Sequence, residues 1–179
     1  MSVAVRAAVP GDAAAIAAIY APYVSDGYAS FEAEPPTCAE VERRMTALPR
    51  LPWLAADDAG RLVGFAYASQ HRSRAAYRWS VDVSVYVDPS AHGRGTGRAL
   101  YERLLPEVRS LGYVCAFAGI TLPNAASMRL HEAVGFAPVG VYRSVGFKAG
   151  AWRDVGWWQL RLREPPADPV DPRQWDPSA

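Results

Sequence analysis

Apolar and polar residues alternate along one segment in the middle of the chain. Valine occupies positions 81, 83, 85 and 87, whereas Ser80, Asp82, Ser84 and Tyr86 fill the positions between them. Side chains at every second residue of a β-strand point to the same face. The alternation therefore predicts a strand over residues 80–87 with one apolar face and one more polar face.

Other patterns predict the remaining elements. Leu100, Leu104 and Val108 keep helical spacing, and Thr37 with Glu40 matches a capping box that opens a helix. A continuous apolar run such as 113–120 is typical of a strand buried on both faces. The predicted strands are 3–8, 53–57, 61–70, 80–87, 113–120, 138–147 and 155–163. The predicted helices follow Asp12, open at Thr37, span 95–111, and run from Asn124 to about residue 134.

The length and composition fit a single domain. The chain has 179 residues, of which 50% are hydrophobic and 21% charged, with a net charge of +1. This balance does not favour nucleic acid as a partner, and no apolar run reaches the 18 residues of a membrane span. The two cysteines, Cys38 and Cys115, show no metal-ligand spacing and suit a reduced cytoplasmic protein. We expect the domain to cover residues 1–163 and the proline-rich residues 164–179 to be a disordered tail.

A glycine-rich turn follows the alternating strand and leads into the predicted helix at 95–111. Glycine stands at positions 93, 95 and 97, with Arg94 and Arg98 between and after them. Backbone N–H groups at a helix N-terminus bind phosphate groups readily. The sequence lacks the Gly-Lys-Ser/Thr of a phosphate-binding P-loop and the GxGxxG spacing of a dinucleotide site. The turn alone is also compatible with a simple tight connection between strand and helix.

The stretch from His92 to Gly97 resembles the acyl-CoA signature of the GNAT N-acetyltransferase superfamily, with His92 where arginine or glutamine is usual. Further blocks, in the same order, resemble the phosphinothricin and methionine sulfoximine acetyltransferase branch of that superfamily. The similarity covers roughly residues 3–163, and its blocks are 30–37, 81–87, 122–127, 130–136 and 146–159.

The resemblance implies a fold and a co-substrate. The fold class is α/β: one domain with a central, mostly antiparallel, twisted sheet that splays at the acyl-CoA site and is flanked by helices. Acetyl-CoA would be the co-substrate, and family behaviour implies a homodimer. The residues expected to bind the co-substrate are Val85, Tyr86, Val87, Gly93, Arg94, Gly95, Thr96, Gly97, Arg98, Asn124 and Ser127.

The resemblance also implies the reacting groups. Asp82 and His131 are the candidates for the base that takes the proton of the attacking amine. The related enzymes carry glutamate at the position of Asp82; aspartate is one methylene shorter, which favours a bridging water. His131 titrates in the useful range. Structural roles, an exposed strand residue and a packed helix residue, are the alternatives for the two positions.

The acceptor would be the α-amine of a small amino acid or analogue, such as phosphinothricin, methionine sulfoximine or methionine sulfone. The residues that match the family's substrate segments are Phe31, Glu34, Arg72, Arg74 and Tyr77. Arginine suits a substrate carboxylate because its guanidinium binds in a bidentate way. Two alternatives stay open: an acetyltransferase for a peptide N-terminus, polyamine or aminoglycoside, and a non-catalytic acyl-CoA-binding module.

Overall fold

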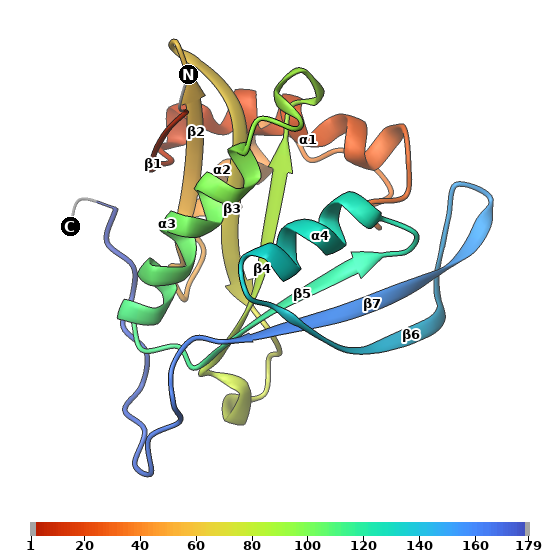
Figure 1. Cartoon of the computed structure of the whole chain (residues 1–179). Helices are drawn as coiled ribbons and strands as arrows, with labels where there is room; N and C mark the ends of the chain where they lie inside the picture. The colour runs from red at the N-terminus through yellow and green to blue at the C-terminus, as the bar shows by residue number, and fades with distance from the viewer. Residues whose placement is uncertain (1–2, 178–179) are drawn as a thin grey trace.

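The computed structural model describes residues 3–177 as one seven-stranded sheet with helices on both faces (Figure 1). The strand order is β1-β2-β3-β4-β5-β7-β6. The strands are β1 (Ala4–Ala7), β2 (Trp53–Asp58), β3 (Arg61–Gln70), β4 (Ser80–Val87), β5 (Cys115–Thr121), β6 (Ala137–Lys148) and β7 (Ala151–Arg161). The helices are α1 (Ala13–Ser25), α2 (Cys38–Thr46), α3 (Thr96–Ser110) and α4 (Ala125–Ala133), with short 3-10 turns η1 (Pro10–Asp12), η2 (Ala75–Tyr77) and η3 (Pro89–Ala91).

Neighbouring strands run antiparallel except at one place, where β4 and β5 are parallel. Only three residue pairs join these two strands, and the last of them is Asp82 with Phe117. Both strands continue beyond this pair, β4 to Val87 and β5 to Thr121. The sheet therefore splays in its centre, as the family resemblance implies.

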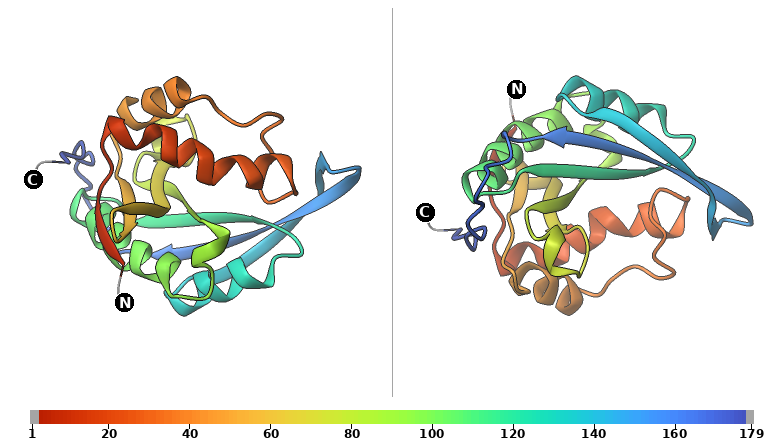
Figure 2. Two further views of the ribbon diagram at one scale, coloured as in Figure 1. Left: turned by 90° about the horizontal axis from the view of Figure 1, so that it is seen from above. Right: turned by 90° about the horizontal axis from the view of Figure 1, so that it is seen from below.

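The helices form two layers, with α1 and α2 on one face of the sheet and α3 and α4 on the other (Figure 2). The alternation in β4 fits these layers. Val81 and Val83 belong to the core that α3 covers, whereas Tyr86 packs with the core under α1 and α2. The predicted two-faced strand at 80–87 is thus confirmed with its bounds.

Local signals fix several of the element ends. The Thr37 hydroxyl accepts a hydrogen bond from the Glu40 N–H at 3.2 Å, so the predicted helix start is confirmed. Ala59 and Gly60 turn the β2–β3 hairpin with positive φ angles. α3 continues through Pro106 to Ser110, so this proline does not shorten the helix.

The β6–β7 hairpin is longer than predicted and projects from the body of the molecule (Figures 1 and 2). Its turn lies at Ala149 and Gly150, both with positive φ, so β7 begins at Ala151 instead of residue 155. The register shifts twice along β6, after Pro138 and after Tyr142. The bounds of β6 still lie within one residue of those predicted, so the difference is confined to β7.

The C-terminal segment differs from the expected disordered tail. Trp175 is 8% exposed and packs in the main core, and its indole N–H donates to Glu107 Oε2 at 2.9 Å. Asp171 pairs with Arg78 at 2.8 Å, and the Val170 carbonyl accepts from the Trp79 indole at 2.8 Å. A proline-rich composition predicts disorder only where large apolar groups are absent. Here the Trp175 side chain packs in the core and docks the segment on the domain. Residues 178–179 of the predicted tail lie outside the described part.

Within residues 3–177, no helix combines the length and apolar character needed to span a bilayer.

Candidate active site

The gap between β4 and β5 opens into a cavity of about 540 Å³. The cavity runs from the splayed strands to the glycine-rich turn and the first residues of α3 and α4. It is lined by residues 83–87 of β4, 118–121 of β5, and Ala91, His92, Gly93, Gly95, Thr96, Gly97, Arg98, Asn124, Ser127 and His131, among others. Most of the residues predicted to bind a co-substrate therefore face one space, Val85, Tyr86 and Val87 included.

The glycine-rich turn ends where α3 begins. Gly93 and Gly95 have φ angles of +71° and +83°, a left-handed conformation that glycine adopts without strain. The first helical hydrogen bond of α3 runs from the Ala99 N–H to the Gly95 carbonyl at 2.9 Å. The N–H groups of residues 96–98 precede this bond and are free to bind an anion.

Two arginines add positive charge at this turn. The Arg94 side chain is 66% exposed and reaches Asp58 only at 4.0 Å. Arg98 is 63% exposed and pairs with Glu102 at 2.8 Å, one helical turn away. Both guanidinium groups can therefore turn toward a phosphate without leaving a buried partner.

His92, the departure from the family signature, ties the turn to the sheet. Its Nε2 lies 2.9 Å from the Val87 carbonyl, which also accepts a 2.6 Å hydrogen bond from the Tyr23 hydroxyl. A carbonyl only accepts, so Nε2 carries a proton. The imidazole thus fixes the start of the turn against the end of β4 and against α1.

Asn124 and Ser127 lie at the start of α4, on the opposite wall of the cavity. The Asn124 Oδ1 caps the helix by accepting from the Ser127 N–H at 3.1 Å, as its sequence position predicts. Both residues line the cavity, and an amide nitrogen and a hydroxyl are groups that can donate to a ligand.

His131 is enclosed between α3 and α4 and is 4% exposed. Its Nδ1 donates to the Ser127 carbonyl at 2.8 Å, and its Nε2 therefore accepts from the Tyr101 hydroxyl at 2.9 Å. Burial lowers the pKa of His131. Both ring nitrogens have partners, so a role as base requires Tyr101 to release Nε2.

Asp82 lies on the other face of β4, away from His131. Its Oδ1 is 2.6 Å from Nδ1 of His71, the residue that follows β3. Burial raises the pKa of the Asp82 carboxyl, while the hydrogen bond from His71 and the charges of His71 and Arg72 oppose this rise. The two predicted candidates for the base thus occupy separate clusters.

His71 was missed in the sequence analysis. It adjoins Arg72, and its ring stacks on Phe117 at 4.4 Å between ring centroids. The signal that could have identified it is the antiparallel register of β3 and β4, which pairs Ser69 with Asp82 and brings the end of β3 to the same edge.

The predicted substrate residues fall into two groups. Tyr77 and Arg72 lie beside His71: Tyr77 contacts the imidazole edge at 5.9 Å, and the Arg72 guanidinium lies 5.5 Å from the Trp157 ring. Arg74 is exposed and precedes η2, with no side-chain contact to this cluster among the described residues.

Phe31 and Glu34 lie on the loop between α1 and α2. The Phe31 ring covers Gly146 of the β6–β7 hairpin, where a Cβ atom would come within 2.3 Å of it, and Glu34 is exposed. Neither residue shares a contact with His71 in the described structure.

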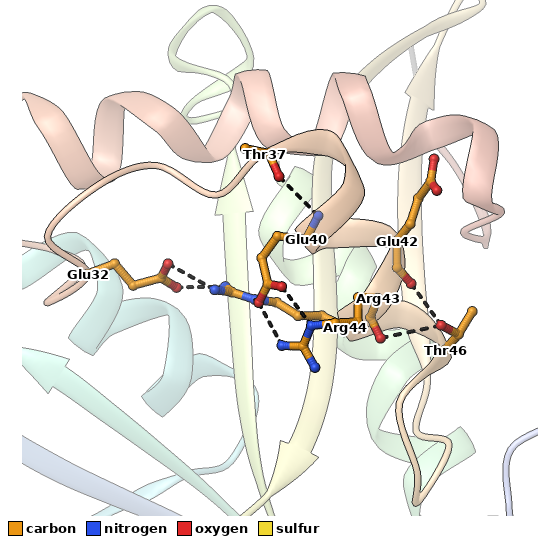
Figure 3. A network of polar contacts seen from close by, with 7 residues as sticks. All are labelled: Glu32, Thr37, Glu40, Glu42, Arg43, Arg44 and Thr46. Atoms are coloured by element: carbon orange, nitrogen blue, oxygen red, sulfur yellow. Dashed lines mark hydrogen bonds and ion pairs between the residues drawn. The ribbon is translucent and has the colours of Figure 1, made fainter.

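An ion-pair network holds this loop. Arg44 of α2 binds Glu32 at 2.7 and 3.1 Å and Glu40 at 2.8 Å (Figure 3). Tyr20 also donates to Glu32 at 3.0 Å, and Lys148 donates to the Glu32 carbonyl at 2.6 Å. The Arg44 guanidinium lowers the pKa of Glu32. The loop is thereby fixed between α1, α2 and the β6–β7 hairpin.

The described residues include no group of three or more histidine, cysteine, aspartate or glutamate side chains placed to hold a metal ion.

Comparison with known proteins agrees with this geometry. The model of the acetyltransferase (GNAT) domain matches residues 5–157. Phosphinothricin N-acetyltransferase of Streptomyces viridochromogenes is 38% identical over 172 residues, which are 95% of this chain and 94% of that protein. L-methionine sulfoximine/L-methionine sulfone acetyltransferase of Pseudomonas paraeruginosa is 33% identical, covering 90% of this chain and 96% of that protein.

A solved structure has the same fold. The phosphinothricin acetyltransferase of Sinorhizobium meliloti, crystallised in complex with acetyl-CoA, superposes with a TM-score of 0.90 at 37% identity. The match covers 95% of this chain and 94% of that one.

Proposed function

The chain belongs to the GNAT acetyltransferase family, and we propose that it transfers the acetyl group of acetyl-CoA to the α-amine of a small amino acid or analogue. The observation that carries this proposal is the splay of β4 and β5 into a cavity that ends at the free N–H groups of α3. The splayed strands suit the pantetheine arm, and the turn at Gly93 to Arg98 suits the pyrophosphate. Asn124 and Ser127 would bind the arm from α4.

The chemistry requires balanced proton movements. The amine nitrogen bonds to the acetyl carbon, the carbon–sulfur bond breaks, and coenzyme A leaves as a thiolate that takes up a proton. The substrate enters as an ammonium, which must first lose a proton to a base. The group centred on Asp82 supports this role better than His131, because both nitrogens of His131 are already hydrogen-bonded.

Direct transfer between the two bound substrates is the route that we propose. An acyl-enzyme would need a nucleophilic thiol beside the acetyl group. Cys38 is exposed on α2, and Cys115 at the start of β5 accepts from the Gln159 amide at 3.3 Å. Neither cysteine lines the cavity.

The acceptor class rests on the relatives and on one cluster of this chain. Arg72 is exposed at the edge of the His71 cluster, where it can pair with a substrate carboxylate. Tyr77 would flank the substrate there, with Phe31 and Glu34 on the opposite loop. We propose phosphinothricin, methionine sulfoximine and methionine sulfone as the first acceptors, because relatives carry these names.

The test is free-thiol release from acetyl-CoA with a panel of amines. The panel holds the three analogues, the ordinary amino acids, a polyamine, an aminoglycoside and a short peptide. We expect turnover with amino acids or their analogues. Arg72→Ala should raise the KM for the amine about tenfold. Arg161 is an exposed arginine on β7, and Arg161→Ala should leave this KM unchanged. Turnover confined to the polyamine, aminoglycoside or peptide would contradict the acceptor class, and tight acetyl-CoA binding without any turnover would favour a binding module.

We also propose that two copies associate through the projecting hairpin. β6 is an edge strand with free backbone groups, and its exposed side chains are largely apolar: Val139, Val141, Tyr142, Val145 and Phe147, with Trp152 of β7 beside Phe147. Exposed apolar edge strands pair readily with a second chain. Analytical ultracentrifugation should give a dimer that Phe147→Lys converts to monomer; a monomer at all concentrations would rule out this association.

The cytoplasm is the location that we propose. Cys38 and Cys115 are both unpaired, and free thiols persist in reducing compartments. Fractionation of the native cells, with detection by antibody, tests this, and recovery from an oxidising compartment would contradict it.

A further inference from the structure

His71 and Asp82 form a hydrogen-bonded pair at the point where the central sheet splays. His71 directly follows β3, and its Nδ1 lies 2.6 Å from Asp82 Oδ1. Asp82 and its neighbour across the strands, Phe117, are the last residues that pair β4 with β5. The cavity begins with the next residues, Val83 and Ala118. The pair therefore stands beside the inner end of the proposed co-substrate site.

Three aromatic rings fix the orientation of the His71 imidazole. Phe117 stacks on it with an interplanar angle of 17°, and Tyr77 and Trp157 contact it edge-on at 5.9 and 6.1 Å between centroids. Trp157 in turn packs on Gly119, which lines the cavity. The His71 side chain is 11% exposed and that of Asp82 26%, so the pair is oriented by the protein and still reaches solvent.

The hydrogen bonds of the three histidines distinguish His71 from the other two. The Asp82 carboxylate can only accept, so the proton of the short bond sits on Nδ1 and leaves a lone pair on Nε2. Among the residues that the structure describes, His71 Nε2 has no hydrogen-bond partner. By contrast, both nitrogens of His131 are occupied. His92 also has one ring nitrogen, Nδ1, without a partner among the described residues, but it lies at the glycine-rich turn at the far end of β4, where its Nε2 is bound to Val87.

We propose that His71 accepts the proton of the incoming amine at Nε2, and that Asp82 is the positioning residue that holds its ring. This inference rests on the proposed acetyltransferase function. The bound ammonium gives one proton to Nε2 and becomes a free amine. Its nitrogen then bonds to the acetyl carbon, the carbon–sulfur bond breaks, the second N–H proton goes to the departing thiolate, and Nε2 returns its proton to water.

This pair also accounts for the aspartate at position 82. The family resemblance implies a glutamate at this position, and the shorter aspartate predicts a bridging water. In the structure the His71 imidazole occupies the space next to the carboxylate.

The charged and titratable groups around the pair come from three directions. Arg72 lies on the segment that follows His71, Tyr77 on η2, and Tyr67 on β3, where burial raises the pKa of Tyr67 and the charge of Asp82 adds to this rise. The positive charge of Arg72 opposes the rise that burial causes in the pKa of Asp82, and so favours the carboxylate that accepts from His71.

The test uses His71→Phe, which keeps the aromatic stack on Phe117, together with Asp82→Asn and the double variant. We expect each single variant to lower kcat by about 100-fold or more, with the KM for acetyl-CoA within twofold of wild type. In wild type kcat/KM should fall with decreasing pH, because a protonated imidazole cannot accept a second proton; His71→Phe should lose this dependence. The kcat of the double variant should equal that of the less active single variant, because the two residues act as a unit.

The controls separate this role from a structural one. Gln70→Ala changes the exposed neighbour at the end of β3 and should leave kcat unchanged. Free imidazole should restore part of the activity of a His71→Ala variant, which a packing defect would not allow. Thermal unfolding and acetyl-CoA binding show whether each variant is folded.

Two kinetic results would overturn the proposal. One is a His71→Phe enzyme with the kcat and pH profile of wild type. The other is a double variant in which the fold-losses of kcat of the two single variants multiply. An NMR measurement of the ¹⁵N shifts of the His71 ring does not depend on turnover: we expect the Nδ1–H tautomer in wild type and its loss in Asp82→Asn. An Nε2–H tautomer in wild type would refute the hydrogen-bonded pair. If the Nδ1–H tautomer is present but the protein acetylates none of the amines, the proposed function is refuted instead.

Discussion

A single buried histidine links the stability of the protein to pH. The folded protein keeps His131 neutral, because burial lowers its pKa, whereas an unfolded histidine takes up a proton near pH 6.5. The unfolded state then binds more protons, so stability falls as the pH drops below this value. We expect His131→Gln, whose amide can bond to both Tyr101 and Ser127, to lose up to about 1.4 kcal/mol per pH unit of this dependence.

Urea unfolding of both proteins between pH 5.5 and 7.5 measures the effect. Asp82 has a raised pKa and contributes with the opposite sign at lower pH. It is present in both proteins, so its contribution cancels in the comparison. Equal pH slopes for wild type and variant would contradict the assignment.

Which residues line the cavity was predictable where a motif or the family resemblance pointed to them. Gly93, Gly95, Thr96 and Gly97 follow from the glycine-rich turn and Asn124 from its helix-cap position, whereas Ser127 was implied by the resemblance. His71 was not predictable in this way. Its partner Asp82 is 11 residues away, and only the register of β3 and β4 and the packing on Phe117 bring the two together.

At the scale of elements, one glycine in β7 determines how closely the strand packs. A Cβ atom on Gly156 would lie 2.5 Å from the ring of Trp158, which is 4% exposed and belongs to the core. We expect Gly156→Ala to lower the free energy of unfolding by about 1–3 kcal/mol, because the ring cannot leave the core.

Gly140 of β6 is the matched control for this substitution. It also lies in the hairpin, but a Cβ atom there meets nothing within 4 Å. Urea unfolding should show little change for Gly140→Ala. A similar loss in the two variants would mean that backbone effects, and not the contact with Trp158, decide the result.

Element prediction succeeded where one period ran through the whole element. The valine alternation of β4 is an example, and the capping box likewise gave the start of α2. The bounds of β6 were predicted to within one residue, but the start of β7 was predicted four residues too late. That start, at Ala151, depends on the turn geometry at Gly150.

At the scale of the whole molecule, the C-terminal segment joins regions that are distant in sequence. The Trp175 N–H donates to the Arg50 carbonyl at 2.9 Å, its indole binds Glu107, and the Arg173 N–H donates to the Leu111 carbonyl at 2.8 Å. We expect Trp175→Ala to lower the free energy of unfolding by about 3 kcal/mol.

Val170→Ala is the control, because this side chain is 77% exposed, and it should change stability by less than about 0.5 kcal/mol. Urea unfolding compares the two variants. An unchanged midpoint for Trp175→Ala would mean that the segment does not contribute to the folded domain. Sequence alone could not predict this docking, because its partners at positions 50, 107 and 111 become neighbours only after the sheet and α3 have formed.

The three residue pairs between β4 and β5 have a mechanical consequence. Among residues 3–177 they are the only strand-to-strand link between a half-sheet of β1 to β4 and a half-sheet of β5 to β7. Backbone hydrogen bonds therefore contribute little to holding the two halves together, whereas side chains from both halves pack in one core. A pantetheine arm that forms hydrogen bonds with the unpaired edges of both β4 and β5 would bridge the gap between the two half-sheets. The bound co-substrate would then stiffen the sheet of the enzyme that uses it.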